Sequence, residues 1–148
     1  MEEDEYKSTY NKLADIRCVF EKALTNRQAK CALSRHFCLA DREGYSCESV
    51  ESSDNCRELL KLLRENSTFV LKLREIDGPL PHNMEIRVQV GGLTGLAKLL
   101  DPASTPPLGD ISRILAQAQK KVGTLDKLPY SEIIQSVVQF QGRRRRQR

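Results

Sequence analysis

The fold class is decided at residues 54–63, DNCRELLKLL, where leucines recur at three- and four-residue spacing. This spacing places apolar side chains along one face of a helix. The pattern continues downstream and predicts a helix over about residues 54–75. Residues 52–54 can cap its start, and Asp77-Gly78-Pro79 ends it. The predicted apolar face consists of Leu59, Leu60, Leu63, Phe69, Val70 and Leu73.

A similar pattern precedes this helix and predicts a first long helix over about residues 4–28. Its apolar face consists of Tyr6, Tyr10, Leu13, Ile16, Phe20 and Leu24. The connector, residues 29–51, is predicted to be irregular or to carry a short helix near Leu33–Asp41 that Gly44 ends. Both long helices and the connector carry cysteines.

The rest of the chain predicts three shorter helices, over residues 93–100, 110–122 and 129–141. Met84–Val90 predicts either a short strand or an extended connector, and Gly91-Gly92 breaks it. The predicted fold class is therefore mainly α. It has two long N-terminal helices, a Cys-bearing connector, three shorter C-terminal helices and at most one short strand.

A chain of 148 residues suits one domain with one core. We expect a single helical domain over residues 1–142, with a Cys-rich metal-binding half at 1–78 and a helical half at 79–142. The net charge of +4 comes from a basic tail, residues 143–148, which leaves the body nearly neutral. The body is therefore not expected to be a basic nucleic-acid-binding domain. The tail is expected to be disordered.

The sequence begins with acidic residues 2–5, the opposite of the basic start of a secretory signal. No apolar stretch approaches the ~20 residues that a membrane-spanning helix needs. We therefore expect a cytoplasmic protein without a membrane span. Cytosolic thiols are normally kept reduced, so the five cysteines are not expected to pair as disulfides.

The cysteines are the strongest functional signal, because all five lie in the first 56 residues. Cys18 falls opposite the apolar face of the first predicted helix, which argues against a purely structural role in the core. Two helices and both ends of the connector could bring distant thiols to one metal centre. The predicted ligands are Cys18, Cys31, Cys47 and Cys56, with Cys38 as a substitute.

The spacing of these cysteines distinguishes between two kinds of metal centre. Structural zinc sites usually use ligand pairs two to four residues apart, whereas the closest cysteines here are seven positions apart. Iron–sulfur clusters are larger and accept family-dependent spacing. The sequence therefore favours a 4Fe-4S cluster, with zinc as the alternative. Five independent buried or idle cysteines, and thiol redox chemistry, also remain open.

Positive side chains near the cysteines are expected to lower the thiol pKa and favour the metal-binding thiolate. They are Arg17, Lys22, Arg27, Lys30, Arg35 and Arg42. His36, two residues from Cys38, is an alternative ligand or a surface residue, and His82 is expected in a loop.

The leading hypothesis is a non-enzymatic iron–sulfur protein that passes electrons to a protein redox partner or senses oxygen or redox state. The rival is a helical adaptor or nucleic-acid-binding accessory protein with structural zinc or no metal. It would contact phosphates or an acidic partner through its basic tail, Arg143, Arg144, Arg145, Arg146 and Arg148.

Overall fold

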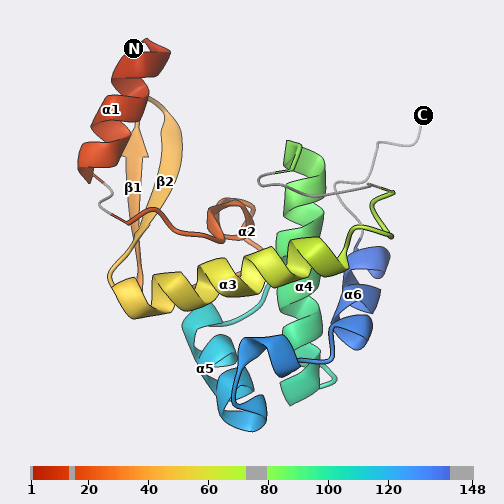
Figure 1. Cartoon of the computed structure of the whole chain (residues 1–148). Helices are drawn as coiled ribbons and strands as arrows, with labels where there is room; N and C mark the ends of the chain where they lie inside the picture. Colours follow the sequence, from red (N-terminus) through yellow and green to blue (C-terminus); the bar gives the residue numbers. More distant parts are fainter. Residues whose placement is uncertain (1, 14–15, 73–79, 141–148) are drawn as a thin grey trace.

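The computed structural model describes residues 2–13, 16–72 and 80–140. In chain order the elements are α1 (Glu3–Leu13), α2 (Glu21–Thr25), β1 (Ser34–Leu39), β2 (Arg42–Cys47), α3 (Val50–Asn66), α4 (His82–Leu100), α5 (Ile111–Val122), the 3-10 helix η1 (Leu125–Lys127) and α6 (Tyr130–Gln139). The described residues are mainly helical with one small two-stranded sheet, which confirms the predicted mainly α class (Figure 1). Within these residues, no helix is both long enough and apolar enough to cross a membrane.

Helix α4 is the centre of the fold, and α2, α3, α5 and α6 all contact it (Figure 1). Every residue from Val88 to Ala97 is buried. Helix α6 approaches α4 at two glycines. A Cβ added at Gly91 would lie 2.6 Å from the Cα of Val137, and one at Gly95 would lie 2.5 Å from the carbonyl oxygen of Ile133.

The strand or extended connector predicted at Met84–Val90 is wrong, because α4 runs through it and through Gly91-Gly92. The predicted helix over residues 93–100 is the second half of α4. The glycines do not break the helix, since the packing that they permit against α6 outweighs their weak helix propensity. Tertiary contacts decided what the local pattern left open.

The long helix predicted over residues 4–28 is also wrong. Helix α1 ends at Leu13 and α2 begins at Glu21, and between them Arg17 forms an antiparallel bridge with Ser46 of β2. The apolar spacing is real, because Tyr10 and Phe20 are both buried. Tyr10, however, packs on Phe37 of the hairpin, with ring centroids 5.0 Å apart, rather than on the helical core.

The connector contains a β-hairpin where the sequence predicted irregular structure or a short helix. Strands β1 and β2 pair antiparallel from Ser34–Cys47 to Leu39–Arg42. The two-residue turn between them, Ala40-Asp41, has φ values of 49° and 64°. Hairpin turns of this kind usually carry Asn-Gly or Asp-Gly, so this sequence lacks the usual hairpin signal.

Helix α3 is the predicted second helix, moved four residues toward the N-terminus and ended earlier. Its cap is Ser49, whose hydroxyl oxygen accepts the N–H of Ser52 at 3.1 Å. The predicted apolar face is correct at Leu59, Leu60 and Leu63 but wrong at Phe69, which is 91% exposed. Leu73 lies outside the described residues.

The C-terminal half agrees with the sequence more closely. Asp110 caps α5, and Gly123 closes it with a φ of 89°. Residues 101–109 form the predicted loop. Helix α6 ends at Gln139, and Pro129 is its N-cap rather than a first-turn residue. The basic tail at residues 143–148 lies outside the described residues.

A buried ion pair joins α3 to α4. The Arg64 Nε donates to both oxygens of the Glu85 carboxylate, at 3.1 and 3.2 Å. Glu85 is 1% exposed and also accepts the N–H of Leu80 at 3.2 Å. The carboxylate therefore has a partner for each oxygen, which a buried charge requires.

Candidate metal centre

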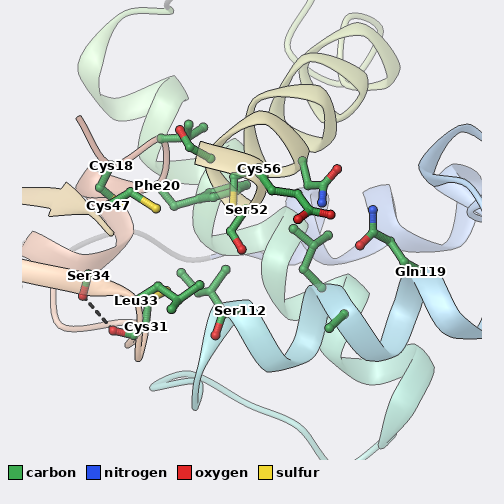
Figure 2. A pocket seen from close by; sticks show the side chains of 17 residues that line it. Cys18, Phe20, Cys31, Leu33, Ser34, Cys47, Ser52, Cys56, Ser112 and Gln119 are labelled. Carbon is green, nitrogen blue, oxygen red and sulfur yellow. Dashed lines mark hydrogen bonds between the residues drawn. The ribbon is translucent and has the colours of Figure 1, made fainter. Parts of the chain in front are cut away.

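Four of the five cysteines line one cavity of about 290 Å³ (Figure 2). They are the four predicted ligands, Cys18, Cys31, Cys47 and Cys56. They come from the segment before α2, the loop before β1, the end of β2 and the second turn of α3. The predicted substitute, Cys38, is exposed on β1 and does not line this cavity.

Cys18 and Cys47 are placed by strand pairing. The Cys18 N–H donates to the Tyr45 carbonyl at 3.0 Å, and the Cys47 N–H donates to the Ile16 carbonyl at 2.7 Å. Alternation along paired segments puts side chains two residues apart on one face. Cys18 and Cys47 both lie one position from the Arg17–Ser46 bridge, so they share the opposite face. This short third segment of the hairpin had no signal in the sequence.

Cys31 is held against the start of α5. The carbonyl of Lys30 accepts the N–H of Ile111 at 2.7 Å, and the carboxylate of Asp110 accepts the N–H of Ala32 at 2.9 Å. The Ser34 hydroxyl donates to the Cys31 carbonyl at 2.7 Å (Figure 2). The cysteine backbone is therefore fixed on both sides.

Two helices begin at this cavity. Residues 51–53 in the first turn of α3 and residues 111–112 in the first turn of α5 line it. Unpaired N–H groups and the helix dipole make a helix N-terminus favourable for negative charge. Both helix starts therefore favour an anionic occupant near the four sulfurs.

The thiols lie close enough to influence each other. Burial raises the pKa of Cys18 to about 12, and the Cys31 and Cys56 thiols contribute to the rise. Burial, then the Cys31 and Cys47 thiols, raises the pKa of Cys56 to about 12. Burial also raises the pKa of Cys31, opposed by hydrogen bonds to its sulfur from the N–H groups of Leu33 and Ser112. At neutral pH these three thiols are protonated and poorly nucleophilic.

The expectation that nearby cations lower the thiol pKa is wrong. Arg17 pairs with Glu21, Arg27 with Glu43, Arg42 with Glu3, and the Lys22 amine with His82. Among the described residues that line the cavity, none is Lys or Arg. The cations are consumed on the surface, and burial controls the thiols instead.

Serines and apolar side chains complete the wall, and the sequence did not identify them. Phe20 and Leu115 close the cavity with apolar surface, and Ser53 and Ser112 contribute hydroxyls. Ser53 was considered only as a helix cap. Its position three residues before Cys56, on the same helix face, was the available signal.

The histidines lie elsewhere. His36 is exposed on β1, with its Nε2 3.6 Å from the Glu43 carboxylate, and His82 begins α4. Among the described residues, no three His, Cys, Asp or Glu side chains form a group that could hold one metal ion. A mononuclear site would therefore require cavity side chains to move toward one another.

No known protein family, curated protein or solved structure was found to be similar to this chain, so the case for its function rests on the residues of this cavity.

Proposed function

We propose that this protein binds a 4Fe-4S cluster through Cys18, Cys31, Cys47 and Cys56, and acts as an electron carrier or a redox or oxygen sensor. The observation that carries the proposal is the meeting of four cysteines, from four separate segments, in one cavity. Such clusters are commonly held by four Cys thiolates.

The dimensions favour a cluster over a single zinc ion. Tetrahedral zinc needs four ligand atoms about 2.0–2.3 Å from one point. The described residues contain no group of three suited to one ion, and the cavity of about 290 Å³ is far larger than an ion. In a four-iron cluster each thiolate binds a different iron, so its ligands are spread more widely than those of one zinc ion.

The chain itself would supply ligands, a dry environment and charge compensation. Each coordinating thiol gives up its proton to solvent when it binds, and the raised pKa values of Cys18 and Cys56 make this release part of assembly. Phe20 and Leu115 limit the access of water. The N-termini of α3 and α5 stabilise the net negative charge that four thiolates leave on the site.

The cluster would supply reversible one-electron chemistry, with the electron coming from or going to a protein redox partner and no covalent bond to the chain breaking. Cluster potential depends on net charge, hydrogen bonds to the sulfurs and exposure to solvent. The buried thiols and the hydrogen bonds to Cys31 from Leu33 and Ser112 belong to these controls.

Metal and sulfide analysis of protein prepared without oxygen tests the proposal. The wild-type protein should be brown and contain about four iron and four sulfide ions per chain. Cys18→Ser, Cys31→Ser, Cys47→Ser and Cys56→Ser should each lose most of both, because each removes one of the four ligands.

Cys38→Ser is the matched control, since Cys38 is exposed and outside the cavity. It should keep the wild-type iron and sulfide content. A folded wild-type protein without iron and sulfide, or one with a single zinc ion, would contradict the proposal.

A further inference from the structure

The hydroxyl of Ser53 is buried at the cavity wall without a hydrogen-bond partner. Ser53 is 2% exposed and lies in the first turn of α3. Among the described residues, its Oγ is the only buried side-chain oxygen or nitrogen with no partner. Native proteins rarely leave such a group unsatisfied, so an acceptor is expected beside it.

Other cavity serines already have partners within the chain. The Ser34 hydroxyl donates to the Cys31 carbonyl, and the Ser112 hydroxyl donates to the Asp110 carboxylate, both at 2.7 Å. The backbone N–H of Ser53 is bonded to the Ser49 carbonyl at 3.0 Å, so only its side chain lacks a partner. The missing acceptor therefore belongs to whatever occupies the cavity.

We propose that the Ser53 hydroxyl donates a hydrogen bond to a sulfur of the bound cluster and thereby raises the cluster's reduction potential. This inference rests on the proposed function. Ser53 precedes the ligand Cys56 by three residues, which puts the two side chains on one face of α3. A hydrogen bond to a cluster sulfur stabilises the reduced, more negative state more than the oxidised state.

The inference predicts opposite effects of one substitution in the two forms of the protein. Without the cluster, Ser53→Ala removes a hydroxyl that bonds nothing, and alanine is the better helix former. The variant should therefore melt at the wild-type temperature or above it. With the cluster, the same change removes a donor, so the reduction potential should fall.

The expected fall corresponds to about a tenfold change in the oxidised-to-reduced ratio at fixed potential, or about 59 mV for a one-electron couple. A redox titration under anaerobic conditions, followed by absorbance or electron paramagnetic resonance, measures it. Ser53→Thr keeps the hydroxyl and should restore the wild-type potential.

Ser67→Ala is the matched control, because Ser67 is a fully buried serine just beyond α3 whose hydroxyl donates to the Leu63 carbonyl at 2.7 Å. It should lower the melting temperature of the cluster-free protein and leave the potential unchanged. Ser53→Ala protein that takes up no cluster while Ser53→Thr protein does would also support the role of the hydroxyl.

Three outcomes overturn the inference. A wild-type protein without iron and sulfide defeats the proposed function and this inference together. A loaded wild-type protein with the same potential as Ser53→Ala defeats the inference alone and assigns the hydroxyl to a water molecule. A cluster-free Ser53→Ala protein that loses as much stability as Ser67→Ala shows that the hydroxyl has its partner within the chain.

Discussion

At the scale of single residues, the cysteines of the cavity differ from the one outside it through burial rather than neighbouring charge. The thiols of Cys18 and Cys56 keep their protons because a thiolate is poorly solvated in this cavity and faces other thiols. They are quiet in the metal-free protein and become ligands only when a cation replaces the proton. This combination suits cluster assembly better than nucleophilic catalysis.

Alkaline pH should destabilise the metal-free protein. Below pH 9 the thiol of Cys18 is protonated in the folded and unfolded chain, and its contribution to stability is fully present. Between pH 9 and 12 the unfolded chain releases this proton while the folded chain keeps it, since burial raises the pKa of Cys18 to about 12. The free energy of unfolding should therefore fall by about 1.4 kcal/mol per pH unit for this thiol.

Urea unfolding of metal-free wild-type and Cys18→Ala protein at several pH values checks this prediction. The stability difference between the two proteins should shrink as the pH rises from 9 to 12, with Cys38→Ala as the exposed-cysteine control. A difference that stays constant over this range would contradict the raised pKa.

At the scale of elements, the two regions that bring the cysteines together are the hairpin and the start of α5. The hairpin carries Cys47 and orders the segment of Cys18, and Asp110 ties Cys31 to α5. Helices α4 and α6 support them from behind with the closest packing in the fold (Figure 1). That packing depends on Gly91 and Gly95, where a side chain would strike backbone atoms.

Gly95→Ala should destabilise the protein although alanine favours helices by about 1 kcal/mol. Its Cβ would lie 2.5 Å from the Ile133 carbonyl oxygen and 2.8 Å from the Ile133 Cα, so α6 must shift as a whole. Overpacking of this kind costs about 1–3 kcal/mol, and we expect a net loss of about 1–2 kcal/mol in thermal or urea unfolding.

Gly109→Ala provides the control, because a Cβ there meets nothing within 4 Å. It should change stability by less than about 0.5 kcal/mol. Equal effects of the two substitutions would show that α4 and α6 do not pack as described.

At the scale of the whole molecule, the cavity depends on segments that have no stability of their own. Its four cysteines come from separate segments, and the core beneath joins Phe20 and Leu59 to Leu93 and Ile133 of the later part of the chain. A ligand that bridges these segments binds the folded chain and not the unfolded one, so it must stabilise the fold.

Removal of the cluster should therefore lower the melting temperature, by on the order of 10 °C for a chain of this size. Anaerobic calorimetry before and after treatment with an iron chelator measures the change. The same treatment of Cys56→Ser protein should leave its melting temperature unchanged. Equal melting of treated and untreated wild-type protein, with iron shown to have left, would contradict the coupling.

Elements with strong local signals could be predicted from the sequence. The cap at Asp110, the closing Gly123 and the apolar spacing of Leu59, Leu60 and Leu63 are encoded within a few residues, so α5 and the centre of α3 were found. The hairpin was missed because Ala40-Asp41 is an unusual turn pair. The continuity of α4 was missed because its glycines make sense only against α6.

The sequence by itself determined that the chain is mainly helical and which four cysteines are candidate ligands, because clustering and separation can be read along a chain. Only the tertiary structure decided that these four meet in one cavity while Cys38 stays outside, that burial rather than Arg and Lys governs their protons, and that Ser53 faces the site without a partner. The physical reason is that burial and proximity depend on contacts between segments far apart in the chain.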